Sequence, residues 1–222
     1  MLLAIDTSTR QVGIAVYDGM MVLAESTWLS QDYHTAELAP AVEGVLQRAR
    51  IQASQLKALG VATGPGSFTG LRIGLALAKG IALACHLPIF GVPSLDILAY
   101  AQPVLDIPLA AVLSAGRQRL AVGWYLAKEN AWQPDGAVEI LDAQSLAERI
   151  QQPTLVCGEL SEADRRTLGR RYRNARLASP ARSLRRPSYL AELAWRRWLT
   201  GKPDDPTALA PIYLHVGEPI PG

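Results

Sequence analysis

The sequence predicts an α/β protein of two subdomains, each a mixed sheet with its elements in the order βββαβα. In residues 1–103, short apolar segments of strand length alternate with longer helical segments. Residues 104–222 repeat this order more loosely, and prolines between positions 103 and 108 mark a hinge between the halves. Short links between strands and helices favour parallel strands beyond the first three.

Three strands open the chain, and we expect them at residues 2–5, 12–17 and 22–27. The pair Asp18-Gly19, between the second and third segments, is a strong hairpin signal. Two hairpins in a row predict an antiparallel meander.

Helices and strands then alternate up to the hinge. Leu38, Val42 and Val45 recur at helical spacing and predict a helix that begins near residue 35. A strand at residues 58–63, a long helix at 68–85 and a strand at 89–92 complete the first subdomain.

The second subdomain shows the same order with weaker signals. We expect strands at residues 109–114, 120–125, 137–141 and 154–157. Asp142 or Ser145 begins a short helix, and a last helix at residues 189–199 precedes a proline-rich tail. This order is typical of the actin-like (ribonuclease-H-like, ASKHA) superfamily, in which the last segment can return to the first subdomain. Order alone does not determine function.

Composition indicates a soluble globular protein. Of 222 residues, 49% are hydrophobic and 19% are charged, with a formal net charge of +2. The two cysteines provide neither a disulfide framework nor a metal-binding spacing. The N-terminus lacks the pattern of a signal peptide, and charged residues interrupt every long apolar run. We therefore expect a cytoplasmic protein that does not bind membranes.

The segment GPGSFTG, between a predicted strand and the long helix, has two interpretations. Gly64 and Gly66 allow unusual backbone angles, and Ser67 is placed to cap the helix. Such a loop can direct backbone N–H groups at a phosphate or carboxylate. It can equally be a tight turn with a good cap. A Walker-type loop is excluded, because no Lys-Ser/Thr pair closes the segment.

The long helix that follows is apolar around most of its circumference. Arg72 and Lys79 are its only charged residues between positions 71 and 85, whereas a helix on one face of a sheet needs a single apolar stripe. Its glycines cost about 1 kcal/mol each relative to alanine, so close packing should explain them. The helix either contacts another subunit or lies under the second subdomain. For a subunit or dimer interface, the predicted residues are Leu38, Ala41, Val42, Val45, Gly70, Ile73, Gly74, Leu77 and Ile81.

Four segments together resemble the TsaB (YeaZ) family: LAIDTST at residues 3–9, His34, GPGSFTGLRIGLALAKG at 64–80 and PIYL at 211–214. The resemblance is strong over residues 1–100. It implies a two-domain actin-like fold related to the catalytic subunit TsaD, and a heterodimer with TsaD through the first two helices. It also implies a homodimer through the same surface when the chain is alone, and a larger complex with TsaE. That complex modifies the adenosine beside the anticodon of tRNA.

The residues argue against an active site of the TsaD type. That family holds a metal with two histidines four residues apart, whereas here Leu38 stands four residues after His34. No metal site and no catalytic residue are therefore predicted. The resemblance implies a non-catalytic scaffold that needs no cofactor of its own, with ATP or ADP bound weakly or at the complex interface.

The alternative is a small actin-like ATPase or kinase that uses Asp6 at the end of the first strand. Phosphate contacts would then come from Asp6, Thr7, Gly64, Gly66 and Ser67. The equivalent turn of the second half begins at Ser114, where relatives usually have Asp-Ala-Arg. Without a second carboxylate, Asp6 alone supports phosphoryl transfer poorly.

An arginine-rich stretch spans residues 165–186 and contains no acidic side chain. Guanidinium groups bind phosphates well, and the residues predicted to contact tRNA are Arg170, Arg171, Arg173 and Arg176. The other interpretations are a solvated helix and loop, or a stand-alone RNA-binding module.

Overall fold

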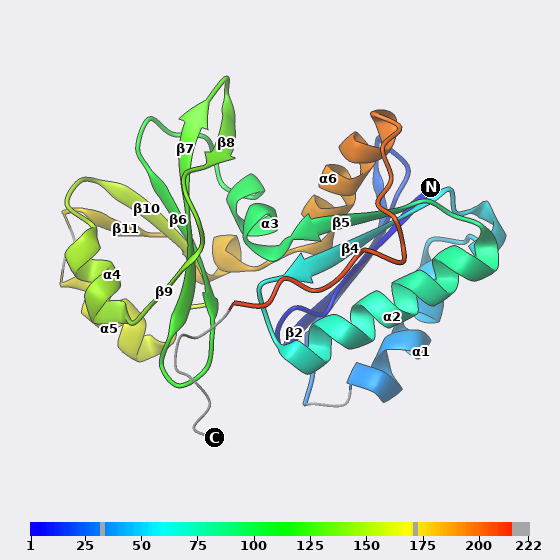
Figure 1. The fold of residues 1–222 in the computed structure, drawn as a ribbon, viewed down its shortest axis with the longest axis horizontal. Helices are drawn as coiled ribbons and strands as arrows, with labels where there is room; N and C mark the ends of the chain where they lie inside the picture. The colour runs from blue at the N-terminus through cyan, green and yellow to red at the C-terminus, as the bar shows by residue number, and fades with distance from the viewer. Residues whose placement is uncertain (32–33, 171–172, 215–222) are drawn as a thin grey trace.

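Two α/β lobes lie side by side with a short helix between them (Figure 1). The structure is a computed structural model and describes residues 1–31, 34–170 and 173–214. Side chains are described throughout these ranges except at positions 34 and 35.

The first lobe contains a five-stranded sheet in the order β3-β2-β1-β4-β5. Its strands are β1 (Leu2–Asp6), β2 (Gln11–Tyr17), β3 (Val22–Leu29), β4 (Ala58–Gly64) and β5 (Ile89–Pro93). β1 pairs with β2 in antiparallel register and with β4 in parallel register. The predicted meander and its parallel continuation are both confirmed.

The second lobe contains a six-stranded sheet with the path β11-β10-β6-β7-β8, and β9 also pairs with β7. Its strands are β6 (Leu109–Ser114), β7 (Leu120–Lys128), β8 (Ala131–Pro134), β9 (Glu139–Leu141), β10 (Thr154–Gly158) and β11 (Ala175–Leu177). Read from β8 to β11, this path repeats the order of the first sheet. The predicted duplication is therefore confirmed, although β8 and β11 were not predicted.

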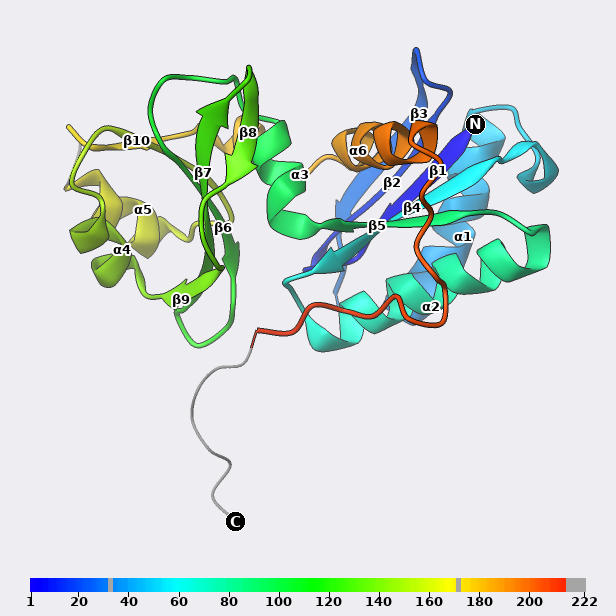
Figure 2. The same ribbon diagram turned by 45° about the horizontal axis from the view of Figure 1, so that its top comes forward.

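Helices cover both faces of the first sheet (Figures 1 and 2). α1 (His34–Arg48) and α2 (Phe68–Cys85) pack on one face, and α6 (Pro187–Leu199) packs on the other. Successive side chains of a strand point to opposite faces, so Leu3 and Ile5 of β1 join the α1–α2 core while Leu2 and Ala4 join the α6 core. β1 is buried on both faces, which explains its uninterrupted apolar sequence.

The second sheet is covered in the same way. α4 (Ala143–Arg149) and α5 (Glu162–Gly169) pack on one face, and α3 (Ser94–Tyr100) packs on the other. Asp142 caps α4, because its carboxylate accepts a hydrogen bond of 2.7 Å from the N–H of Ser145.

The helices α3 and α6 correct the predicted domain boundary. α3 belongs to residues 1–103 by sequence but packs on β6, β7 and β10 of the second lobe as well as on β4 and β5 of the first. α6 belongs to residues 104–222 but packs on β1, β2 and β4 of the first. A division at position 103 therefore separates the sheets but not the folded units.

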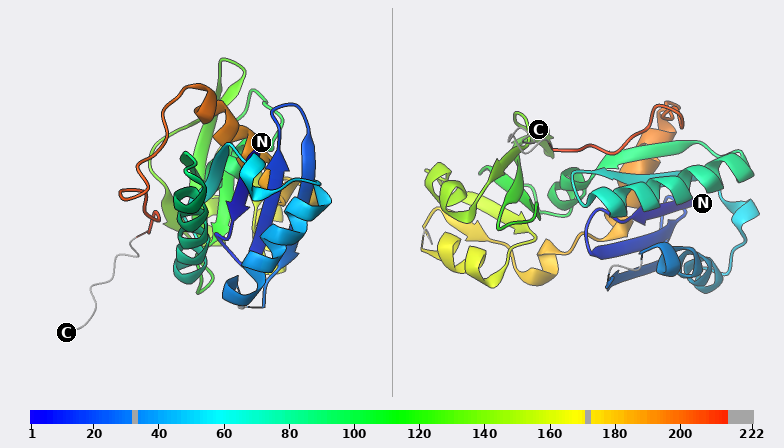
Figure 3. Two further views of the ribbon diagram at one scale, coloured as in Figure 1. Left: turned by 90° about the vertical axis from the view of Figure 1, so that its right-hand side faces the viewer. Right: turned by 60° about the horizontal axis from the view of Figure 1, so that its bottom comes forward.

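The described part of the tail lies along the first lobe (Figure 2). The N–H of Asp204 donates to the carbonyl of Ile89 at 2.9 Å, and the N–H of Ile212 donates to the carbonyl of Thr63 at 2.7 Å. Arg197 of α6 holds the Asp204 carboxylate through two hydrogen bonds. Figure 3 shows the tail leaving α6 and running towards the second lobe.

Candidate functional site

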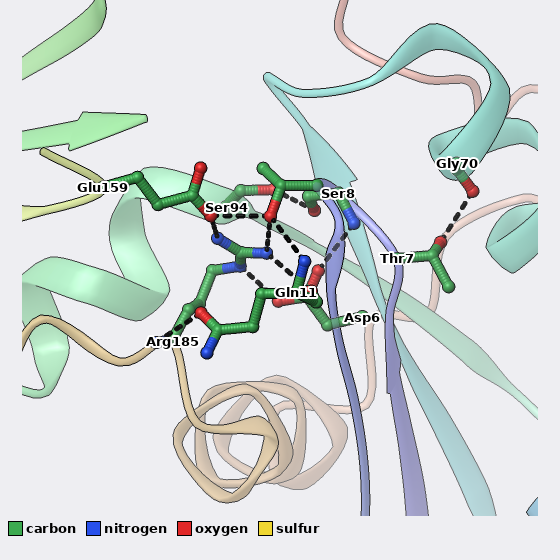
Figure 4. Close-up of polar contacts among 9 residues, drawn as sticks. Asp6, Thr7, Ser8, Gln11, Gly70, Ser94, Glu159 and Arg185 are labelled. Carbon is green, nitrogen blue, oxygen red and sulfur yellow. Dashed lines mark hydrogen bonds and ion pairs between the residues drawn. The ribbon is translucent and has the colours of Figure 1, made fainter. Parts of the chain in front are cut away.

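A fully buried arginine occupies the junction of the two lobes, beside the end of β1 (Figure 4). Arg185 lies between the short 3₁₀ helix η2 (Pro180–Ser183) and α6. Its Nε donates to Asp6 Oδ2 at 2.5 Å, and its Nη2 donates to Thr9 Oγ1 at 3.0 Å and to the carbonyl of Gln11 at 3.2 Å. The other oxygen of Asp6, Oδ1, accepts from the N–H of Ser8 at 2.9 Å.

A second carboxylate reaches the same guanidinium from the other lobe. Glu159 Oε1 accepts from Arg185 Nη1 at 3.0 Å and from Thr9 Oγ1 at 2.6 Å. Glu159 directly follows Gly158, the last residue of β10. Neither Glu159 nor Arg185 was predicted as a site residue from the sequence.

One signal could have found Glu159, because the two lobes repeat a local pattern. β4 ends at Gly64 (φ 107°) and β10 ends at Gly158 (φ 115°), a backbone region that favours glycine. In each lobe a serine three residues later caps the next helix: Ser67 for α2 and Ser161 for α5. No comparable pattern marks Arg185, which belongs to a run of arginines most of whose described members are exposed.

Asp6 and Arg185 form a buried ion pair, and this pairing affects the pKa of the arginine. Burial lowers the pKa of the Arg185 guanidinium, but the charges of Asp6 and Glu159 and their hydrogen bonds outweigh that effect, so its pKa is raised. A buried cation of this kind needs paired anions. The Asp6 carboxylate, 1% exposed, is therefore engaged inside the protein.

The predicted phosphate contacts are only partly brought together. Thr7 is buried and its hydroxyl donates to the carbonyl of Gly70 at 2.7 Å. Asp6 and Thr7 are not among the residues that line the cleft between the lobes, because one pairs with an arginine and the other with α2. The phosphate contact predicted for these two residues stays a prediction. Gly66 and Ser67 do line the cleft.

The Gly-rich loop forms a tight, capped turn. Ser67 Oγ accepts from the N–H of Gly70 at 3.3 Å, and the N–H of Ser67 donates to the carbonyl of Ser8 at 2.6 Å. An added Cβ at Gly66 would lie 2.0 Å from that same carbonyl oxygen. The loop therefore packs against the turn after β1, and an anion contact there stays a prediction.

Next to the Arg185 network, a cleft with a volume of about 860 Å³ lies between the two lobes. Thr9, Gln11 and Glu159 line its polar part, whereas Phe68 and Leu113 are among its apolar lining residues. At one side the Phe68 and Tyr213 rings lie 4.9 Å apart, and the Arg72 guanidinium lies 3.7 Å from the Phe68 ring centroid.

The predicted interface residues divide into two groups. Several are buried inside the chain: Leu38, Val42, Val45, Gly70 and Gly74. Others are half-buried at the surface of α1 and α2: Ala41, Ile73, Leu77 and Ile81. Only the second group is accessible to another subunit.

The packing reason for two helix glycines differs from the prediction. An ideal Cβ at Gly74 would lie 2.1 Å from Thr7 Oγ1, and one at Gly70 would lie 2.3 Å from the Thr7 carbonyl oxygen. Their absent side chains let α2 approach the end of β1 in the same chain, not a second helix. Gly80, by contrast, has open space where its Cβ would be.

An apolar groove with a volume of about 440 Å³ lies between α1 and α2. Its lining includes Ala39 and Leu46 from α1 and Ala76, Leu77 and Gly80 from α2. By length and composition α2 could cross a membrane, but it packs on β4 and β1 as one layer of the lobe. Its remaining apolar surface, including Leu83 at 79% exposure, faces outward.

The residues at the TsaD-type metal position do not fit a metal. Leu38 is 2% exposed in the α1–α2 core and has no donor atom. Within the part of the chain that the structure describes, no group of three His, Cys, Asp or Glu side chains is arranged to hold an ion.

Within its described residues, the arginine stretch does not form one continuous basic patch. Arg185 is buried, Arg186 pairs with Glu25, and Arg166 pairs with Glu162. Of the residues predicted to contact tRNA, the exposed ones are Arg170, Arg173 and Arg176, while Arg171 lies outside the described residues.

Two sheets of the same strand order, facing each other across a cleft, define a two-subdomain protein of the actin-like, ASKHA type. YeaZ from Pseudomonas aeruginosa has this fold: it is 25% identical, with a TM-score of 0.76 over 96% of this chain and 99% of that chain. The tRNA threonylcarbamoyladenosine biosynthesis protein TsaB of Bacillus subtilis is 30% identical over 224 residues, or 98% of this chain and 95% of that protein. The chain belongs to the TsaB family.

Two further comparisons agree with this assignment. Residues 26–140 match the family described as TsaD, tRNA N6-adenosine threonylcarbamoyltransferase. TsaB of Escherichia coli is 30% identical over 154 residues, which cover 68% of this chain and 66% of that protein.

Proposed function

We propose that this chain is a non-catalytic subunit of tRNA threonylcarbamoyladenosine biosynthesis, which binds a TsaD-type partner through α1 and α2. The single observation that carries the proposal is the apolar groove between these helices. A contiguous apolar surface on a soluble protein marks a contact with another molecule. The choice of pathway, tRNA threonylcarbamoyladenosine biosynthesis, is supported by the TsaB relatives and by the match to the TsaD family.

The burial of Asp6 and its ion pair with Arg185 support the proposal. An actin-like phosphotransferase needs carboxylates that are accessible to a metal–phosphate group. Here Asp6 is buried against Arg185, and Ser114 occupies the equivalent turn of the second lobe. A binding role therefore fits these residues better than catalysis by this chain.

Substitution of Gly80 tests whether the groove between α1 and α2 binds the partner. Gly80→Arg places a charge in the groove, where an added Cβ meets nothing within 4 Å, and arginine favours a helix over glycine. We expect no loss of stability but a loss of partner affinity of about 2 kcal/mol or more, roughly thirtyfold. The side chain fills part of the groove and its charge is desolvated on binding, a cost that the Glu43 carboxylate in the groove lining offsets only in part. Titration calorimetry with purified TsaD measures this loss.

Gly169→Arg is the matched control. Gly169 ends α5 in the second lobe and has the same open space, so this variant should bind TsaD like the parent chain. Equal binding by all three proteins would place the interface elsewhere. Magnesium-dependent ATP hydrolysis by the pure chain, abolished by Asp6→Asn, would instead favour the ATPase alternative.

A further inference from the structure

The buried network around Arg185 joins three segments that are distant in the sequence. Arg185 lies on the return from the second lobe to the first, two residues before α6 begins. Asp6 ends β1, Thr9 lies in the turn that follows, and Gln11 begins β2, all in the first lobe. Since α6 also packs on the first sheet, Arg185 is held by the first lobe.

Glu159 belongs to the other lobe. It follows β10, whose residues pair with β6 in the second sheet. Its Oε2 accepts from the N–H of Ser114 at 3.4 Å, at the end of β6. Its Oε1 crosses the junction and accepts from both Thr9 and Arg185. A single carboxylate thus links the ends of two sheets.

The hydrogen bond between Arg185 and Glu159 forms only when Glu159 approaches the guanidinium from one direction. A guanidinium presents its N–H groups in a fixed planar fork, and the bond from Nε to Asp6 fixes the orientation of that fork. Nη1 then offers its hydrogen to Glu159 from one direction only. Rotation of the second lobe would separate Glu159 from Nη1 and leave a buried guanidinium with one anion fewer, which is unfavourable.

We propose that Glu159, Arg185 and Thr9 form a latch that fixes the angle between the two lobes and holds the cleft at one opening. The latch is part of the chain itself, so it acts without a ligand or a partner. It is independent of the proposed binding to TsaD, because its residues lie at the junction of the lobes and not in the groove between α1 and α2.

The latch can be tested by measuring the distance between the lobes. Spin labels are attached at Gln47→Cys on α1 and Gln144→Cys on α4, both exposed positions, in a Cys85→Ser background. Cys157 remains unlabelled, because burial raises the pKa of its thiol to about 12. Double electron–electron resonance then gives the distance distribution between the labels.

Glu159→Gln is the decisive variant, because it removes the second anion and leaves the Asp6–Arg185 pair in place. We expect the single narrow distribution of the parent chain to broaden, because the angle between the lobes is no longer fixed. Thr9→Val should produce a smaller broadening. Glu139→Gln is the control, since its partner Arg149 lies in the same lobe, and it should leave the distribution unchanged.

Two results would overturn the latch. One is a Glu159→Gln distribution that coincides with that of the parent chain. The other is equal broadening in Glu139→Gln, which would show that any lost ion pair loosens the second lobe.

Discussion

Arg185→Ala is expected to destabilise the chain by about 3–5 kcal/mol, because it leaves Asp6 buried without its cation. For a chain of this size that corresponds to a fall in Tm of roughly 6–20 °C. Both side chains of the pair are at most 1% exposed, so the Asp6 charge lies away from bulk solvent and depends on its partner inside the protein. Thermal unfolding followed by circular dichroism measures the change.

Arg186→Ala is the natural control for this prediction. Arg186 is the next residue and also forms an ion pair, with Glu25; its side chain is 51% exposed and that of Glu25 is 14% exposed. When Arg186 is removed, Glu25 keeps its two hydrogen bonds from Ser188. Exposed pairs contribute about 0–1 kcal/mol, so its Tm should change little. Asp6→Asn combined with Arg185→Met should recover part of the loss, because it removes both charges together. Equal losses for the two single arginine variants would refute the structural role of Arg185.

Gly74→Ala is expected to destabilise the first lobe by roughly 1–3 kcal/mol, as overpacking of a filled core does. The added Cβ would lie 2.1 Å from Thr7 Oγ1, and the Thr7 hydroxyl is already fixed by its bond to the Gly70 carbonyl. The same change at Gly80, in open space, should stabilise the helix by up to about 1 kcal/mol. Urea denaturation of both variants provides the comparison.

The prediction is tested by the direction of the two changes: Gly74→Ala should lower the free energy of unfolding, whereas Gly80→Ala should raise it. Stabilisation by both substitutions would show that Thr7 and α2 can separate freely. The result also determines how the interface should be studied. A bulky residue at Gly74 would disturb the fold itself, whereas Gly80 reports on binding alone.

The strands were predictable where their sequence is apolar and continuous. β1, β4 and β6 are buried on both faces, and their apolar runs have no other explanation. β8 and β11 lie at the edges of the second sheet, and each has exposed residues in its short length. Edge strands carry a weak apolar signal, so the sequence did not distinguish them from loops.

The placement of helices and of the buried charges was not predictable from local patterns. The apolar face of α6 indicates a buried helix but not which sheet it covers. Arg185 is chemically the same as its exposed neighbours, and only the fold brings it to Asp6. For Gly70 and Gly74 of α2, the sequence predicted close packing correctly but not its partner, because Thr7 is distant along the chain. For Gly80 the prediction of close packing was wrong, because an added Cβ there would meet open space.

The exchange of α3 and α6 between the lobes has a consequence for synthesis. During translation from the N-terminus, α3 is made before the sheet that it covers, whereas α6 is made long after its sheet. Leu2, Ala4 and Phe90, which pack against α6, therefore stay uncovered until residues 187–199 leave the ribosome. Uncovered apolar surface of this kind is where nascent chains aggregate or recruit chaperones. The first lobe can reach its final form only when nearly the whole chain has been released.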